Sequence, residues 1–394
     1  MKLFLPIAVS AASILITTPL AVAEDPYTFS ASNRPVSAEE LAKGIDRGIE
    51  FLLKDQNKDG SWGSPRQTKG LNIYAPAPGA HGAFRTAVTA LCISALYESG
   101  DAETNEEILR SMARGEDYLL AELPKVRRAT GDAIYNVWAH GYGIQALVRM
   151  HQRAKKLKDE PRCEKILGVI NGQIDRLARY ESVDGGWGYY DFRYQTAKPS
   201  SSSISFTTAT MLVAFKEAET IEGIEVPDKL IKRAIASIKR QQKSDNTYAY
   251  GEYLKLSPMK GINRASGSLG RSQACNIALR MWGDEGITDE VLDEWLTRLG
   301  ERNGWLSIGR KRPVPHEAWS QVAGYFYYYG HYYAALCIED LPPEKAAIHQ
   351  NMLAGVILDL QEKDGSWWDF PFYSYHQPYG TAFAVMTLLR CEKE

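Results

Sequence analysis

The chain has 394 residues, 44% of them hydrophobic, and 46 basic residues against 48 acidic ones give a formal net charge of −2. Because binding to a nucleic-acid backbone needs a basic surface, this balance argues against a nucleic-acid partner. The length suits one large domain or two small ones.

The first residues have the pattern of a secretory signal. Lys2 precedes an apolar stretch, and residues 21–23 are small, as at a signal-peptidase site. We therefore expect residues 1–23 to be a signal peptide and residues 24–36 a linker, with the protein exported to the periplasm or the exterior. An uncleaved anchor is the alternative. No later stretch has 18 consecutive apolar residues, so no stable membrane span is expected after cleavage.

Five cysteines are distributed along the chain, and none forms a Cys-x-x-Cys pair. The odd count leaves at least one thiol unpaired. Most of the cysteines lie inside apolar helical patterns, where small buried hydrophobes are common. The sequence therefore predicts neither a disulfide scaffold nor a zinc or redox motif.

A tryptophan-containing corner recurs along the chain. It occurs at residues 56–63, 181–188 and 361–368, with degraded copies at 241–250 and 301–305. The aromatic positions 62, 187, 250, 305 and 367 predict a period of about 62 residues, with one corner missing near residue 125. The residues assigned to the corners are Gln56, Asp59, Gly60, Trp62, Trp187, Trp305, Gln361, Gly365 and Trp367.

Each period contains two helical patterns. Ser37 and Glu40 form a capping box, and apolar residues then recur at helical spacing up to the first corner. The first pair ends with the more apolar run 81–97. The other pairs are 103–122 with 135–151, 162–180 with 204–218, 228–242 with 268–282, 289–300 with 316–338, and 344–361 with 377–391.

Six such hairpins predict an all-α fold. The apolar second helices would form an inner ring, and the charged first helices an outer ring. An open solenoid would need polar caps at its ends, whereas the last pair is as regular as the others. We therefore expect a closed α/α toroid over residues 37–394.

The corner Gln-x-x-Asp-Gly-Ser-Trp resembles the repeat of the prenyltransferase and squalene cyclase family. The resemblance covers residues 37–392 and implies an α/α toroid in which the Gln and Trp of each corner stabilise the fold. It also implies isoprenoid chemistry. The Asp-x-Asp-Asp acid of the cyclases and the Asp-x-Cys zinc ligand of the protein prenyltransferases do not occur here. No cofactor or metal is therefore assigned, and the reaction stays open.

Several polar residues fall on the predicted inner ring. His81, His316 and His376 lie at predicted helix starts, where free N–H groups and the helix dipole favour an anion. These three, with Arg85 and His331, are the catalytic candidates. The candidates for substrate binding are His140, Asp191, Arg271, Tyr327, Asp369 and Tyr379. Each histidine could instead cap a helix or bond a neighbouring corner.

Residues 325–333 hold six tyrosines, one phenylalanine and His331. Ser320, Gly324, Tyr327 and His331 would form one stripe on a helix spanning 316–338. Such an aromatic wall can stack on sugar rings or stabilise a cationic isoprenoid. Packing between helices is the structural alternative.

Three functions remain. The first is an exported toroid protein that binds an isoprenoid or other hydrophobic ligand in its central cavity. The second is a polysaccharide lyase or glycoside hydrolase that acts on an acidic polysaccharide and holds an oligosaccharide in the cavity. The third is a non-catalytic envelope protein whose surface binds other proteins. The sequence leaves the oligomeric state undetermined.

Overall fold

The computed structural model describes residues 30–31, 34–70, 79–100, 104–129, 135–189, 196–199 and 203–392, so the proposed signal peptide lies outside it. These residues form α-helices joined by loops and short 3-10 helices, and their β-structure is limited to two isolated bridges. The predicted all-α class is confirmed. None of the helices among the described residues is both long enough and apolar enough to cross a membrane.

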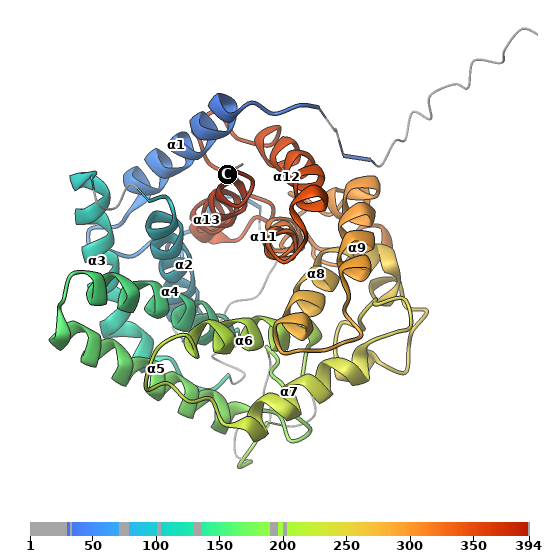
Figure 1. Ribbon diagram of the computed structural model, residues 1–394, viewed down its shortest axis with the longest axis horizontal. Coiled ribbons are helices and arrows are strands. Elements are labelled where there is room, and N and C mark those ends of the chain that lie inside the picture. Colours follow the sequence, from blue (N-terminus) through green and yellow to red (C-terminus); the bar gives the residue numbers. More distant parts are fainter. Residues whose placement is uncertain are drawn as a thin grey trace, which may run out of the picture.

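Twelve of the helices form two concentric rings (Figure 1). The outer ring consists of α1 (Ala38–Asp55), α3 (Glu106–Glu122), α5 (Glu160–Tyr180), α7 (Asp228–Gln241), α9 (Asp289–Glu301) and α12 (Pro343–Leu358). The inner ring consists of α2 (Gly79–Glu98), α4 (Val137–Lys156), α6 (Ser205–Ala218), α8 (Ala265–Met281), α11 (Phe326–Glu339) and α13 (His376–Leu389). These are the six predicted hairpins. The short helix α10 (Asn303–Ser307) follows α9.

The two rings differ in how their helices are buried. In α1, the Ser37 side chain accepts the N–H of Glu40, and one stripe that includes Leu41, Ile45 and Leu52 is buried. In α6, by contrast, nearly every residue is buried. A helix that is apolar on all sides needs partners all around it. This explains why the second helix of each pair occupies the inner ring.

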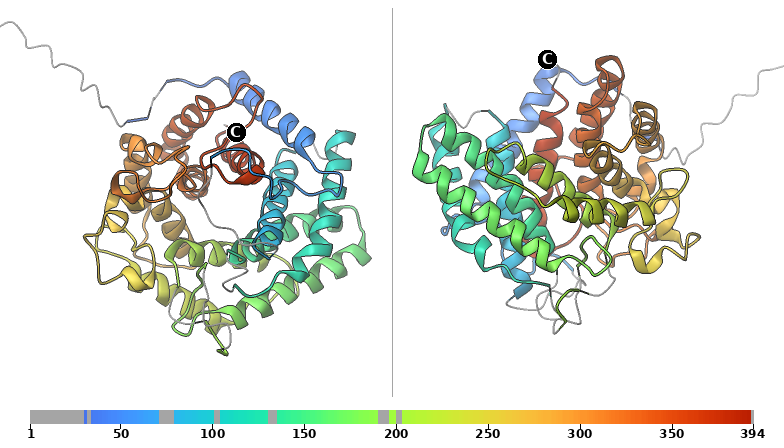
Figure 2. Two further views of the ribbon diagram at one scale, coloured as in Figure 1. Left: turned by 180° about the vertical axis from the view of Figure 1, so that it is seen from behind. Right: turned by 60° about the horizontal axis from the view of Figure 1, so that its bottom comes forward.

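The ring closes by the same contacts that join its repeats. Arg114 of α3 donates to Gln56 Oε1 in the preceding corner, and Arg47 of α1 donates to Gln361 Oε1 in the last corner at 2.8 Å. Helix α1 therefore packs beside α12 and α13, at the junction of the first and last repeats (Figures 1 and 2). The glutamines also donate to the neighbouring outer helix, to the carbonyls of Ser111 and Gly44.

Each complete corner joins an outer helix to an inner one through its tryptophan. The indole N–H of Trp62, Trp187 and Trp367 donates to the carbonyl ten residues earlier, at 2.7, 2.9 and 2.8 Å. The backbone N–H of each tryptophan donates to a threonine hydroxyl on the following inner helix, at 3.0–3.1 Å. These hydroxyls belong to Thr89, Thr208 and Thr381.

The corner glycines sit where only glycine fits. Gly60 and Gly365 have φ of 88° and 90°, and a Cβ on either would collide with a backbone carbonyl of the next outer helix. Asp59 shapes the same turn by accepting the N–H of Ser61 at 3.1 Å. The turn and the contact between repeats therefore depend on the same residues.

The structure corrects two of the degraded corners. Tyr248, not Tyr250, occupies the tryptophan position. It is fully buried, and its N–H donates to Ser268 Oγ at 3.2 Å. Tyr250 instead faces the centre of the ring. Trp305 lies in α10, only partly buried, and packs against Trp319, so it does not form a comparable corner. Where a corner has lost its tryptophan, the spacing of the repeat alone does not show which residue takes that position.

The fifth inner helix begins ten residues later than predicted. Helix α11 starts at Phe326, and the preceding segment is irregular, with φ of 62° at Lys311, 65° at His316 and 55° at Ser320. The predicted stripe through Ser320 and Gly324 therefore does not exist, because both residues precede the helix. Pro313 and Pro315 oppose helix formation in this segment.

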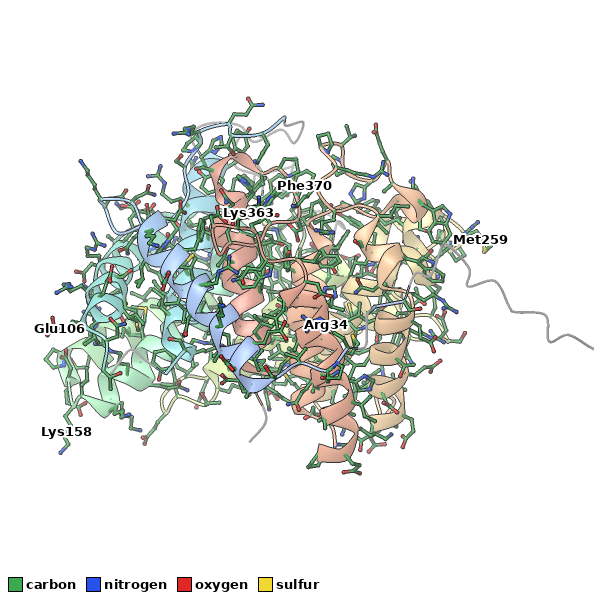
Figure 3. The ribbon with its side chains drawn as sticks, turned by 90° about the horizontal axis from the view of Figure 1, so that it is seen from above. Arg34, Glu106, Lys158, Met259, Lys363 and Phe370 are labelled. Carbon is green, nitrogen blue, oxygen red and sulfur yellow. The ribbon has the colours of Figure 1, made fainter. Side chains whose placement is uncertain are left out.

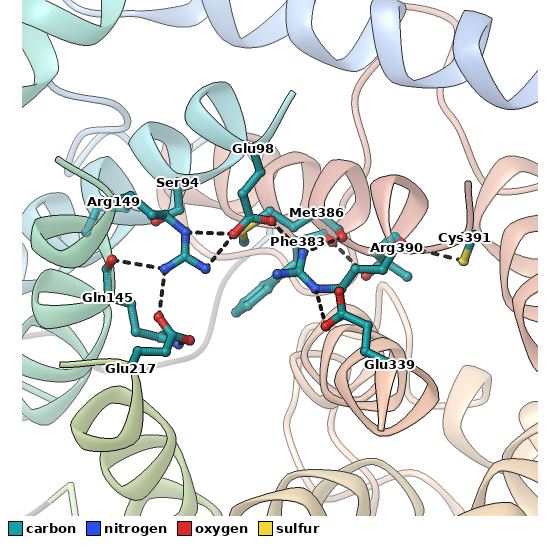
Figure 4. Close-up of polar contacts among 12 residues, drawn as sticks. Ser94, Glu98, Gln145, Arg149, Glu217, Glu339, Phe383, Met386, Arg390 and Cys391 are labelled. Carbon is teal, nitrogen blue, oxygen red and sulfur yellow. Dashed lines mark hydrogen bonds and ion pairs between the residues drawn. The ribbon is translucent and has the colours of Figure 1, made fainter. Parts of the chain in front are cut away.

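Charged side chains join the C-terminal ends of five inner helices (Figure 4). Glu98 accepts from Arg149 at 2.7 Å and also pairs with Arg390. Arg149 reaches Glu217 at 2.8 Å, and Arg390 reaches Glu339 at 3.1 Å. Both arginines and Glu98 are largely buried, whereas Glu339 is half exposed, and the network links the helices at this end of the ring.

All five cysteines are buried and none forms a disulfide. The sequence prediction of a fold without a disulfide scaffold is confirmed. The stability of the toroid therefore rests on apolar packing and on the corner contacts.

Candidate functional site

A cavity of ≈ 190 Å³ lies at the centre of the inner ring, toward the N-terminal ends of its helices. Of the 18 residues that line it, 13 are phenylalanine, tyrosine or tryptophan. The lining residues are Phe84, Ala87, Val88, Leu91, Tyr135, Trp138, Tyr142, Tyr189, Phe206, Tyr250, Pro315, His316, Tyr325, Phe326, Tyr329, Phe370, Phe372 and Tyr379. Phe370 lies at the upper end of the molecule in Figure 3.

The inner helices supply much of this wall from their first two turns. Phe84 in α2, Trp138 in α4, Phe206 in α6, Phe326 in α11 and Tyr379 in α13 all lie near a helix start. Because the inner helices run parallel around the ring, these aromatic side chains converge on one space. The loops that precede the helices add Tyr189, Tyr250, Phe370 and Phe372.

The rings of the wall pack on one another. Phe206 and Phe326 meet edge to face with centroids 5.0 Å apart, and Phe84 and Phe372 do so at 4.4 Å. Trp138 stacks on Tyr142 at 5.6 Å. Such contacts add to the stabilisation from burial and hold each ring in place. The cavity therefore has a preformed, aromatic and largely apolar surface.

One polar pair interrupts this surface. His316 Nδ1 lies 2.8 Å from the Gln321 carbonyl, which can only accept, so Nδ1 carries the proton. Nε2 is then an acceptor, and the Tyr325 hydroxyl donates to it at 2.9 Å. Burial lowers the pKa of His316, and the nearby Arg271 and Lys260 lower it further. The imidazole is therefore neutral at pH 7.

Two residues of the wall have strained backbones. Tyr135 has a φ of 67° and His316 a φ of 65°, a region that residues with side chains seldom occupy. Such strain persists only where surrounding contacts enforce it, and it concentrates at functional sites. Here it aims an aromatic ring and the imidazole into the cavity.

Of the predicted site residues, the cavity brings together His316 and Tyr379. The Tyr379 hydroxyl donates to the Tyr325 carbonyl at 2.9 Å, which ties α13 to the start of α11. His316 lies in the loop before α11, not at a helix start as predicted. Asp191 lies outside the described residues.

Three other candidates near the rim contact the surrounding loops. His81 is in the first turn of α2, beside Tyr373 and Tyr375, with ring centroids 4.7 and 6.0 Å away. Arg85 reaches Asp59 of the first corner at 3.4 Å. His376 begins α13, and its Nδ1 donates to the Tyr373 carbonyl. None of the three lines the cavity.

The predicted pair Tyr327 and His331 lies in the core between α10 and α11. His331 Nδ1 donates to the Tyr327 carbonyl at 2.7 Å, and its Nε2 accepts from Asn303 at 2.8 Å. The Tyr327 hydroxyl donates to the same Asn303 at 3.0 Å. Both side chains thus stabilise the fold, and the aromatic wall uses Phe326 and Tyr329 from this helix instead. The residues differ because, in a helix that begins at Phe326, Phe326 and Tyr329 face the cavity and Tyr327 and His331 face α10.

Buried polar contacts hold the remaining three candidates. His140 donates from Nδ1 to Gln173 at 2.7 Å, and burial lowers its pKa to about 4. Arg271 is fully buried behind Tyr250 and Phe326 and donates to the carbonyls of Tyr248 and Gly267, at 3.0 and 2.7 Å. Asp369 accepts the N–H of Tyr328 at 3.1 Å, in the first turn of α11.

Beyond the aromatic run at residues 325–333, most of the aromatic lining was not predicted from the sequence. The sequence does contain a pattern that indicates the lining, because five of the six inner helices have an aromatic residue within their first two turns. The contribution of Tyr189, Tyr250, Phe370 and Phe372 was not visible, because it depends on how loops fold over the ring.

The solved structures with similar folds include two enzymes that are named after saccharides. Cellobiose 2-epimerase from Spirochaeta thermophila matches with a TM-score of 0.58 and 13% identity over 90% of this chain and 96% of that chain. An α-1,6-mannanase from a Salegentibacter species matches with a TM-score of 0.54 and 12% identity, over 89% and 98%. No protein-family model and no curated protein sequence matches the chain. At these identities the likeness shows the toroid fold alone.

Proposed function

We propose that this protein is an exported α/α toroid that binds an apolar, isoprenoid-type ligand in the aromatic cavity of its inner ring. The observation that carries the proposal is the composition of the wall, with 13 aromatic residues among 18. Binding sites of this kind gain affinity from apolar area removed from water and from contact with ring faces. Methyl-branched chains and carbon–carbon double bonds suit such faces.

The hydrogen bonding of the wall supports an apolar ligand over a sugar. The Tyr329 hydroxyl donates to the Phe206 carbonyl at 3.0 Å, and the Tyr379 and Tyr325 hydroxyls also donate within the protein. A buried sugar needs a partner for each hydroxyl, and an unmet hydrogen bond is costly. The two arginine candidates are already engaged, Arg85 by Asp59 of the first corner and Arg271 by backbone carbonyls.

Native mass spectrometry of the protein purified from its own host provides the first test. A retained hydrophobic mass, on a chain with the mass of residues 24–394, would support both the ligand class and export. A retained glycan would contradict the ligand class. A mass that includes residues 1–23 would contradict cleavage.

A matched pair of variants places the ligand. Phe206 and Phe215 are both on α6 and both buried, but only Phe206 lines the cavity. Each Phe→Leu change removes a similar ring from the core. We expect F206L to weaken the binding of farnesol about two- to thirteenfold, from the loss of ~0.5–1.5 kcal/mol of ring contact. F215L should bind as the wild type does. The readout is the intrinsic tryptophan fluorescence of the protein, to which Trp138 of the cavity wall contributes. Cellobiose is the saccharide probe.

Equal affinities of F206L and F215L for farnesol would show that the ligand does not sit in this cavity. Binding of cellobiose that F206L weakens would overturn the proposed ligand class while keeping the site. A Trp138→Phe variant checks that the fluorescence change arises at the cavity.

A further inference from the structure

Large apolar side chains are exposed on two neighbouring loop segments, residues 253–264 and 310–319. Among the described residues, eight large apolar side chains are exposed, and five of them lie in these segments. They are Tyr253, Leu256, Met259, Val314 and Trp319. Leu256 is 89% and Met259 71% exposed, which is an unusual concentration for a surface in contact with water alone.

The two segments form one continuous surface. Helix η4 (Gly261–Asn263) contacts η5 (Trp319–Gln321), and Ile262 donates its N–H to Gln321 Oε1 at 3.3 Å. Ser266 and Ser320 are joined by a hydrogen bond. In Figure 3, Met259 lies at the right-hand edge of the molecule. We call residues 253–264 and 310–319 the apolar–basic surface.

Basic residues outnumber acidic ones on this surface, although the whole chain is nearly neutral. The two segments contain six basic residues and one acidic residue, and two of the basic residues pair with carboxylates outside the segments, Lys255 with the buried Glu252 and Lys311 with Glu362. Lys255, Lys260, Arg264 and Arg312 are exposed, as is the acidic Glu317. Lys260 stands beside Met259. Apolar side chains interleaved with cations, together with Tyr and Trp, are the composition of a surface that enters a lipid headgroup region.

The apolar–basic surface also adjoins the cavity. Pro315 and His316 belong to the second segment and line the cavity, and Trp319 lies three residues beyond His316. The first segment follows Tyr250, another residue of the wall, and continues into the start of α8. A surface seated on a bilayer at this position would place the lipid phase next to the site.

We propose that the apolar–basic surface docks on a membrane containing anionic lipids, and that the ligand of the cavity is taken from that membrane. The second part rests on the proposed function, because only an apolar ligand is concentrated in a bilayer. The charge excess selects a lipid surface over an apolar protein groove, since cations near anionic headgroups are attracted to them. The contact is peripheral, made by loop tips.

The test is flotation of the full exported protein with vesicles of phosphatidylcholine containing phosphatidylglycerol. We expect binding that weakens about tenfold or more in the double variant Leu256→Glu, Met259→Glu, and that falls with added salt. Ile348→Glu is the matched control, because Ile348 is 64% exposed on the outer helix α12 and lies outside this surface. It should float as the wild type does.

Three results would overturn the docking proposal: no flotation of the wild type, equal flotation of the double variant, or a stable dimer in solution that the double variant abolishes. The last result would identify a second copy of the chain as the occupant. The affinity for farnesol delivered in cyclodextrin separates this proposal from the proposed function. The double variant should bind farnesol with the affinity of the wild type, because its changes lie outside the cavity. Weaker farnesol binding by F206L tests the cavity separately.

Discussion

At the scale of single residues, burial determines how the side chains can act. Asp369 illustrates this: its Oδ2 accepts the N–H of Tyr328 at the start of α11, but its carboxyl is fully buried. Burial raises the pKa of Asp369 to about 7, although backbone hydrogen bonds such as that from Tyr328 act to lower it. Between about pH 4 and 7, the unfolded chain therefore ionises Asp369 while the folded protein retains its proton, and stability falls as the pH rises.

Asp369→Asn should remove this loss, so that the free energy of unfolding falls less between pH 4.5 and 7.5 than it does in the wild type. Urea unfolding at the two pH values measures it. Asp364→Asn is the comparison, because hydrogen bonds from the Ser366 hydroxyl and N–H hold the pKa of Asp364 below its ordinary value of about 4, so Asp364 is ionised at both pH values and its replacement should leave the slope unchanged. Asp364 stabilises the fold above its unfolded pKa and loses that effect as the pH falls. An unchanged slope in Asp369→Asn would contradict the prediction.

At the scale of elements, each corner depends on a hydroxyl that the corner sequence does not contain. Thr208 Oγ1 accepts the N–H of the buried Trp187 at 3.0 Å. Thr208→Val keeps the shape but leaves this N–H without its partner, and we expect a loss of about 1–3 kcal/mol in stability. Thr220→Val, at an exposed hydroxyl after α6, should change stability by less than about 0.5 kcal/mol. Chemical denaturation compares the two, and equal effects would refute the role of the corner bond.

At the scale of the whole molecule, the ion pairs of the inner ring hold separate repeats together. Glu98 of α2 pairs with Arg149 of α4 and with Arg390, which directly follows α13. We expect Glu98→Gln to cost about 3–5 kcal/mol, because two buried guanidinium groups lose their shared carboxylate. Glu339→Gln should cost less than about 1 kcal/mol, since Glu339 is half exposed. Thermal unfolding of the two variants is the check, and similar losses would show that burial does not decide the effect.

The fold was largely predictable because its repeat is local. The corner at 56–63, the capping box at Ser37 and the apolar periodicity of each helix lie within short stretches of chain. They predicted six hairpins in two rings. Tyr248 and Trp305 show the limit, since a corner without its tryptophan has no signal of register, and helix α11 began later than its aromatic run indicated.

The candidate site was much less predictable, because it is built by side chains from every part of the chain. Periodicity could place His331 on an inner helix, but only the phase of α11 decided that it bonds Asn303 while Phe326 faces the cavity. By itself, the sequence determined the all-α repeat architecture and its ring of paired helices, since these follow from local patterns. Tertiary structure alone decided which residues line the cavity, which polar groups are already bonded, and where exposed apolar loops adjoin it. Those properties depend on how distant segments meet around the closed ring.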